Sequence, residues 1–312
     1  MLYSPQQLHI PDGFLTLIVS LVFWLVTIVV VGLAVSKTNQ SLGEKQIPLM
    51  GVMAAFIFAA QMLNFPIAGG TSGHFLGGSL AAIVLGPWAG ILVMTAVVGV
   101  QGLLFQDGGL LVMGANIFNM GIITSVVGFG LYRMVVSQKR GLRIAFAGIG
   151  AWIATMAAAL FTALQLWLSG TTRLEIVVPA MLGVHALIGL GEALITIAAL
   201  SYIEQTRPDL LGIEHSKEAG GRGWIIAGIL VSLIAIFLSP MASGNPDGLE
   251  RVAQDLGFLN QGLGSPYQIL PGYTIPLFGE TALSTILAGI VGAVVIAGLI
   301  ILVGRNLRRK GA

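Results

Sequence analysis

The sequence predicts an all-α, polytopic membrane protein with about nine transmembrane helices, arranged as seven followed by two. Hydrophobic residues make up 56% of the 312 residues, charged residues only 9%, and the mean hydropathy is +0.93. A soluble domain carries about a quarter charged residues. Apolar stretches long enough to cross a bilayer recur along the chain, and basic residues are concentrated between particular pairs of them.

Each predicted span is an apolar stretch bounded by polar or helix-breaking residues. A helix of about 20 residues crosses the hydrocarbon core of a bilayer. The stretch at 75–86 is shorter, so we expect it to be tilted or buried among other helices, and Pro87 separates it from the next span. The expected spans are 14–35, 48–63, 75–86, 88–105, 111–132, 144–168, 177–203, 223–240 and 281–303.

The distribution of lysine and arginine predicts the orientation. With the N-terminus outside, nine spans place four segments in the cytoplasm, namely 36–47, 133–143, 204–222 and 304–312. These segments hold 13 of the 15 basic residues, and only Arg173 and Arg251 stay outside. The positive-inside rule therefore favours an outer N-terminus and a cytoplasmic C-terminus. The net charge of +2 and the lack of a basic stripe with interleaved aromatic residues argue against nucleic acid as a partner.

The same topology divides the chain into modules. Residues 9–203 form a seven-span module, and the charged segment 204–222 is a cytoplasmic linker. Residues 223–312 form a second module of two spans joined by the outer segment 241–280. That segment is too small for an independent hydrophobic core, so we expect it to act together with the spans around it.

Two of the four histidines, His9 and His74, lie in short polar segments that this topology places on the outer face. His74 ends the glycine-rich segment 64–74, which we expect to be irregular. A single interfacial histidine more often caps a helix or bonds a carbonyl group. As a pair in a chain without cysteine, the two indicate a transition-metal site for nickel, cobalt, copper or zinc rather than calcium or magnesium. Two imidazoles do not complete such a site, so further donors must come from the backbone or the chain terminus.

Other polar residues in or near the apolar spans have two interpretations. They either make hydrogen bonds between helices or form a second shell that orients the site histidines. These residues are Gln61, Asn64, Asn116 and Asn119.

His185 and Glu192 lie within one predicted span, nearly two helical turns apart on one face. An ionisable group inside a membrane is by default the basis for a hypothesis of function. We favour a structural polar network for this pair over a proton path. His215 lies in the charged segment 204–222 and is expected to be solvated.

Several motifs together resemble the cobalt/nickel substrate-binding component of energy-coupling-factor transporters, the CbiM/NikM family. The similarity runs from His9 to about residue 203, and the two C-terminal spans with their outer segment resemble the companion subunit CbiN/NikN fused to the chain. The motifs are His9-Ile-Pro-Asp-Gly13, Ala59-Ala-Gln-Met-Leu-Asn-Phe-Pro66, Gly69-Gly-Thr-Ser-Gly-His74, Gly114-Ala-Asn-Ile-Phe-Asn-Met-Gly121 and Pro246-Asp-Gly-Leu-Glu250.

The resemblance implies a function and a set of metal donors. It implies a membrane component that imports Co²⁺ or Ni²⁺, as substrate and not as cofactor, in the inner membrane of a bacterium. Its partners would be an energy-coupling transmembrane subunit and two ATP-binding cassette ATPases. In the family, the terminal amine, the amide and imidazole nitrogens of the second residue, and a later histidine bind the metal. Carried over, His9 supplies its amide and imidazole, and His74 supplies its imidazole.

This sequence departs from the family pattern at its start. Leu8 stands where the initiator methionine is expected, so its nitrogen can act as an amine donor only in a chain that begins there. We favour a misassigned start, because leucine codons can initiate translation in bacteria; residues 1–8 are then an extra or misassigned extension. The alternative is a real extension that is removed or that leaves an altered site.

Two other functions remain open at this stage. An ion-coupled secondary transporter of a divalent transition metal would use His185 and Glu192 as a proton path. An intramembrane enzyme would need a carboxylate near the histidines, and Asp12 is the only acidic residue close to either in the sequence. The chain contains no Gly-x4-Gly-Lys-Ser/Thr motif, so we expect no ATPase activity of its own.

Docking of the coupling subunit suggests one further expectation. Small residues on the helix at 48–63 are expected to form the docking face. They are Ala54, Ala55, Ala59 and Ala60.

Overall fold

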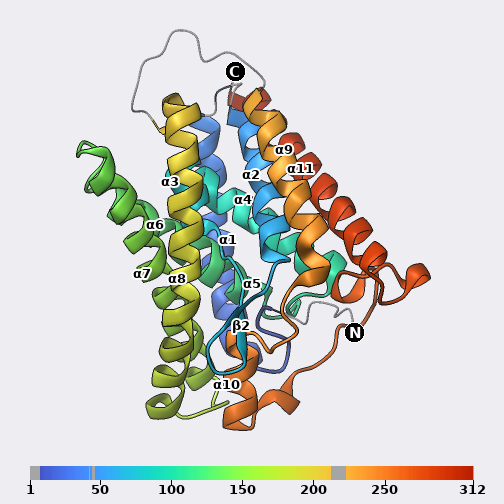
Figure 1. The fold of residues 1–312 in the computed structure, drawn as a ribbon. Helices are drawn as coiled ribbons and strands as arrows, with labels where there is room; N and C mark the ends of the chain where they lie inside the picture. The colour runs from blue at the N-terminus through green and yellow to red at the C-terminus, as the bar shows by residue number, and fades with distance from the viewer. Residues whose placement is uncertain (1–7, 42, 44–45, 212–222, 312) are drawn as a thin grey trace.

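The computed structural model describes residues 8–41, 43, 46–211 and 223–311, and it shows a bundle of long helices (Figure 1). His215 and most of the predicted linker lie outside these residues. The elements in chain order are α1 (Leu17–Ser41), α2 (Gln46–Gln61), β1 (Phe65–Ile67), β2 (Thr71–Gly73), α3 (Gly78–Leu85), α4 (Pro87–Val100), α5 (Met113–Ile117), α6 (Thr124–Arg133), α7 (Arg140–Leu168), α8 (Leu174–Thr206), α9 (Gly223–Leu238), α10 (Gly248–Leu256) and α11 (Ala282–Gly311).

The fold class predicted from the sequence is confirmed. Within the described residues, seven helical segments are long and apolar enough to cross a membrane, and α2 is a shorter apolar helix. All nine predicted stretches are at least partly helical. The stretch at 75–86 forms only the eight-residue α3, which extends about 12 Å and is almost entirely buried. Its small residues allow this burial: a Cβ on Gly90 of α4 would lie 2.8 Å from the Cα of Ala82.

The elements divide between two ends of the bundle (Figure 1). The start of α9 and the end of α11 lie at one end, where Arg143 of α7 pairs with Glu204 of α8. The β-hairpin and α10 lie toward the other end, with the turn between α7 and α8. This arrangement agrees with the division expected from the basic residues, and the assignment of one end to the cytoplasm stays a prediction.

The glycine-rich segment 64–74 forms a small hairpin. The prediction that this segment is irregular is therefore wrong. Strands β1 and β2 are antiparallel, with Phe65 opposite Gly73. Gly69 and Gly70 occupy the turn with positive φ angles of 77° and 68°, a conformation that glycine adopts without strain. Strand β2 ends directly before His74, so the hairpin fixes the position of that residue.

The C-terminal module packs closely on the rest of the chain. Helix α2 contacts α11, α9 and α4. Ala54 and Ala59 are fully buried and Ala60 is 8% exposed. The expected docking face for a coupling subunit on α2 is therefore wrong, because this chain's own helices bury most of it.

Segment 8–16, which precedes α1, is held in place by Asp12. The carboxylate of Asp12 accepts hydrogen bonds from the backbone N–H groups of Leu110, Leu111 and Val112 at 2.9–3.2 Å. These residues lead into α5, whose first N–H groups have no partner within the helix. Asp12 thus links the segment to the loop after α4.

Replacing Asp12 with alanine is expected to destabilise the protein. The substitution leaves three N–H groups without their acceptor, and an unsatisfied buried donor costs about 1–3 kcal/mol. Thermal unfolding in detergent, followed by circular dichroism, should show a melting temperature several degrees lower. Asp255→Ala is the control, because that carboxylate is exposed and pairs only with Arg251 one helical turn away. Equal melting temperatures would contradict the anchoring role of Asp12.

Candidate metal-binding site

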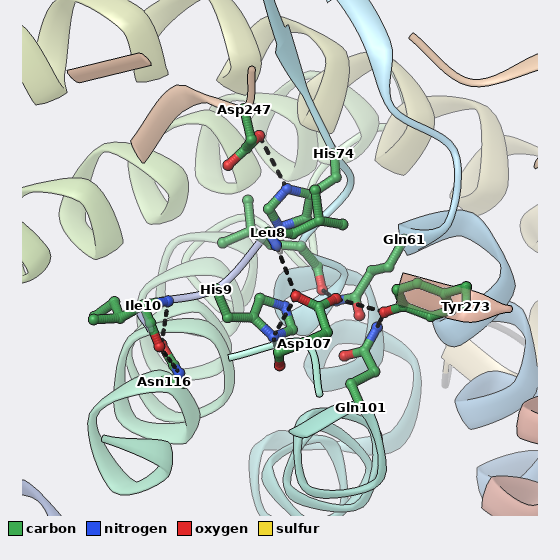
Figure 2. Close-up of polar contacts among 11 residues, drawn as sticks. Leu8, His9, Ile10, Gln61, His74, Gln101, Asp107, Asn116, Asp247 and Tyr273 are labelled. Carbon is green, nitrogen blue, oxygen red and sulfur yellow. Dashed lines mark hydrogen bonds and ion pairs between the residues drawn. The ribbon is translucent and has the colours of Figure 1, made fainter. Parts of the chain in front are cut away.

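The structure brings His9 and His74 together (Figure 2). His9 lies in the segment before α1, and His74 follows β2. Their ring centroids are 5.9 Å apart, and the ring planes meet at 64°. Both residues are buried, with 3% and 8% of their surface exposed. Two residues 65 positions apart in the sequence thus form one pair of imidazoles.

Each imidazole uses one nitrogen for the protein and leaves the other unused. Nδ1 of His9 lies 3.0 Å from the backbone carbonyl oxygen of Asp107, and Nδ1 of His74 lies 3.3 Å from Oδ1 of Asp247. A proton on Nδ1 satisfies both contacts and leaves the lone pair on Nε2. Both Nε2 atoms are buried and have no hydrogen-bond partner among the described residues. A buried polar atom without a partner is costly, which points to a ligand here.

The local charges make the two histidines different. Burial outweighs the attraction of Asp107 and lowers the pKa of His9, which favours a neutral imidazole. Burial also opposes protonation of His74, but the charge and hydrogen bond of Asp247 prevail and raise the pKa of His74. The same contact outweighs burial at Asp247 and lowers the pKa of its carboxyl group. His74 therefore lies against a carboxylate.

A cavity of about 50 Å³ adjoins the two imidazoles. It is lined by residues that include Leu8, His9, His74, His185 and Asp247. Within the part of the chain that the structure describes, no three histidine, aspartate or glutamate side chains are grouped to hold a metal ion. A metal bound at the pair of histidines therefore needs donors besides side chains of these kinds.

The backbone beside His9 is held by two buried side chains (Figure 2). The N–H of Leu8 donates to Oδ1 of Asp107 at 2.7 Å. Asn116 bonds Ile10 on both sides: its Oδ1 accepts from the N–H of Ile10 at 3.1 Å, and its Nδ2 donates to the carbonyl at 3.0 Å. Nitrogen atoms of the segment are thereby fixed at the edge of the cavity.

A change of helical form presents Asp107 to the site. Helix α4 continues as a π-helix over Gln101–Phe105, and Gln106 then adopts a left-handed conformation with φ of 56°. The side-chain amide of Gln106 donates to the carbonyl groups of Leu103 and Leu104, which stabilises the reversal. Short π-helical segments are often found at functional sites. Asp107, which follows this reversal, therefore lies beside the segment that carries His9.

The four predicted polar residues have different roles. Asn116 holds Ile10, and Gln61 donates from Nε2 to the carbonyl oxygen of Leu76 at 2.7 Å, so both contact the backbone near a histidine. Asn64 is buried, and its backbone carbonyl oxygen accepts from the N–H of Ser243, whereas its side-chain Oδ1 has no hydrogen-bond partner among the described residues.

Asn119 bonds Thr162 and Gln165 of α7 and so joins two helices. None of the hydrogen bonds of these four side chains is made to an imidazole within the described structure.

His185 and Glu192 make separate contacts. Nδ1 of His185 lies 2.8 Å from the carbonyl oxygen of Met181 on the same helix. Glu192 is 1% exposed, and its carboxylate accepts the N–H groups of Leu76 and Gly77 at 2.6 and 2.9 Å. Glu192 thus holds the backbone that connects His74 to α3.

The groups that contact the imidazoles through Nδ1 are not among the residues predicted from the sequence. Asp107 and Asp247 lie beside the histidines, although both are distant from them in the sequence, whereas Asp12, the acidic residue near His9 in the sequence, binds the backbone before α5. One signal was available for Asp247, because Pro246-Asp-Gly248 repeats the Pro11-Asp-Gly13 pattern of the segment that carries His9.

Comparisons with known proteins agree with this architecture. Residues 9–210 match the family CbiM, described as the cobalt uptake substrate-specific transmembrane region, and residues 222–309 match the PDGLE domain. A protein of Archaeoglobus fulgidus named as a fused nickel transport protein is 39% identical over 301 residues, which cover 94% of this chain and 96% of that protein. The cobalt transport protein CbiM of Geobacter sulfurreducens is 30% identical, covering 74% of this chain and 69% of its own length.

A solved structure shows the same fold. The crystal structure of a transition metal transporter matches with a TM-score of 0.59 and 34% sequence identity. The match covers 68% of this chain and all of that one.

Replacing Glu192 with glutamine tests its contact with the backbone after His74. A glutamine has one accepting oxygen and an NH₂ group that cannot accept, so one of the two N–H groups loses its partner. We expect a loss of about 1–3 kcal/mol in stability, seen as a lower melting temperature in detergent. Glu175→Gln is the matched control, because Glu175 is exposed in the first turn of the same helix. If both variants have the melting temperature of the unchanged chain, Glu192 does not hold this backbone.

Proposed function

Because the chain belongs to the family of the cobalt uptake substrate-specific transmembrane region, we propose that it is the substrate-specific membrane component of an ATP-driven importer for Co²⁺ or Ni²⁺. The chain is a multi-pass membrane protein and a cobalt/nickel transport component. The observation that carries the proposal is the pair of buried, unpartnered Nε2 atoms on His9 and His74. They would bind the metal on the outer face before its release inward.

The chemistry of the site supports a transition metal as substrate. Imidazole nitrogen suits Co²⁺ and Ni²⁺, whereas Ca²⁺ and Mg²⁺ prefer cages of oxygen ligands. The hydrogen bond on each Nδ1 fixes the ring and leaves the lone pair of the buried Nε2 for a metal. Both metals accept this donor type, so the residues support either one equally.

We propose the Leu8 nitrogen and the His9 amide as the remaining donors. Leu8 lines the cavity, and its nitrogen lies 2.7 Å from a carboxylate oxygen of Asp107. A terminal amine at Leu8 would be an additional nitrogen donor, whereas a peptide nitrogen there is a poor one. A site made of two imidazoles and backbone nitrogens also agrees with the absence of a third grouped side chain in the described residues.

Import driven by ATP requires partners. We propose an energy-coupling transmembrane subunit and two ATP-binding cassette ATPases, because the sequence carries no phosphate-binding loop of its own. Gln61 and Asn116 would act as supports for the ligand-bearing backbone, and Asn64 and Asn119 as structural polar residues. His185 and Glu192 would have structural roles rather than carry protons.

Replacing His9 or His74 with alanine is expected to abolish high-affinity binding of Co²⁺ and Ni²⁺. Loss of an outer-shell partner costs roughly 10–100-fold in metal affinity, and loss of a ligand should cost more. Calorimetric titration of the purified chain in detergent measures affinity, and uptake of radioactive metal in cells that also express the partners measures transport. Thermal unfolding verifies that each variant is folded. A folded His74→Ala variant with unchanged affinity would contradict the proposed site.

The role of the Leu8 nitrogen can be tested by changing where the chain begins. A chain that starts with methionine in place of Leu8 has a free amine at that position, and it should bind Co²⁺ more tightly than a chain that starts one residue earlier. In the longer chain the same nitrogen belongs to a peptide bond, so it is the matched control. Mass spectrometry confirms each start. Equal affinities would exclude this nitrogen as a donor.

A further inference from the structure

The C-terminal module reaches the metal site at two separate points. Asp247 contacts His74, and Tyr273 contacts Asp107, which in turn holds Leu8 (Figure 2). Both residues belong to the outer segment 241–280 between α9 and α11. They lie at the site although the histidines belong to the other module.

Asp247 is held rigidly beside His74. The N–H of Ser72 in β2 donates to the carbonyl oxygen of Pro246 at 2.9 Å, and Ser72 and Asp247 form a parallel β-bridge. Gly248 permits the approach to α8, because a Cβ there would lie 3.0 Å from Cε1 of His185 and 2.7 Å from Ile188. The carboxylate is 3% exposed, so it faces the imidazole and not bulk water.

Tyr273 reaches the site through Asp107. It is fully buried, and its ring stacks on Phe105 with centroids 4.8 Å apart and an angle of 17°. Its hydroxyl donates to Oδ2 of Asp107 at 2.5 Å and accepts from Nε2 of Gln101 at 3.1 Å. Oδ1 of the same carboxylate accepts from the Leu8 nitrogen, and the Asp107 carbonyl lies against His9.

We propose that Asp247 and Tyr273 are positioning residues of the metal site, supplied by the outer segment of the C-terminal module. Asp247 binds Nδ1 of His74 and so holds the ring with its Nε2 on the side away from the carboxylate. Tyr273 restrains one oxygen of Asp107 and so orients the other toward the Leu8 nitrogen. The inference rests on the proposed function, because it concerns how tightly and in what geometry the same metal is bound. A ligand that is oriented in advance binds metal more tightly than one that must be ordered.

The test uses the full chain in detergent, with Co²⁺ alone as the probe. Asp247→Asn removes the negative charge beside His74, and Tyr273→Phe removes the hydroxyl group that binds Asp107, both with little change in volume. Asp255→Asn and Tyr267→Phe are the matched controls, because both lie in the same outer segment and their hydrogen bonds go to Arg251 and to the Leu103 carbonyl group, away from Asp107 and the histidines. Calorimetry measures affinity, the visible absorption of bound Co²⁺ reports its coordination geometry, and thermal unfolding reports stability.

We expect Asp247→Asn to weaken Co²⁺ binding roughly 10–100-fold and Tyr273→Phe about 10-fold, each with an altered Co²⁺ spectrum. The controls should keep the affinity and the spectrum of the unchanged chain. A role in folding alone would lower the melting temperature but leave the spectrum of the bound metal unaltered. Tyr273→Phe removes a single oxygen atom, so it still decides the matter where Asp247→Asn fails to fold.

Two results separate this inference from the proposed function. If the unchanged chain binds Co²⁺, His74→Ala abolishes binding, and the folded variants Asp247→Asn and Tyr273→Phe keep the original affinity and spectrum, the positioning role is overturned while the site stands. If the unchanged chain binds neither Co²⁺ nor Ni²⁺, the proposed function fails, and the positioning role fails with it.

Discussion

The outer end of this protein depends on one constraint: backbone that leaves a helix near membrane depth must find its hydrogen-bond partners within the protein. Segment 8–16 and the connection from β2 to α3 are such backbone. Asp12 and Asn116 satisfy the first, and Glu192 and Gln61 satisfy the second. Because these side chains are committed to the backbone, they hold the two histidine-bearing segments in place without contacting the imidazoles.

The two imidazoles have different hydrogen-bond partners. His9 is bonded to a backbone carbonyl group and His74 to a carboxylate, and their pKa values move in opposite directions, lowered at His9 and raised at His74. A carboxylate on the far nitrogen makes an imidazole a more basic ligand. The two rings can therefore contribute unequally to a shared ligand even though they are the same kind of donor.

The fold and part of the site could be predicted from the sequence. Hydropathy identified every long helix, and the distribution of basic residues put His9 and His74 at one end, where the structure also places them. The length of α3 could not be predicted, because Phe75 and Leu76 are as apolar as the helix that follows but serve as a non-helical connection held by Glu192.

The partners of the histidines were also beyond the sequence. Asp107 lies 98 residues from His9, and Asp247 lies 173 residues from His74. Neither spacing follows a helical or strand period, so hydrophobic periodicity predicts neither contact. Asn119 shows a different difficulty: its motif suggested a role at the site, but its side chain bonds Gln165 and so joins α7 to the π-helical segment Phe118–Ile123. Whether a polar side chain contacts the site or joins two helices depends on how the helices pack.

The presence of both modules in one polypeptide changes how the site is completed. For separate subunits, pairing of the outer segment with β2 would depend on the abundance of each protein. Here the bridge between Ser72 and Asp247 forms within one chain, for which the effective concentration of a tethered partner is on the order of millimolar. The stoichiometry is fixed at one outer segment for each site. A weakened contact would therefore reopen and close repeatedly without the segment being lost by dilution.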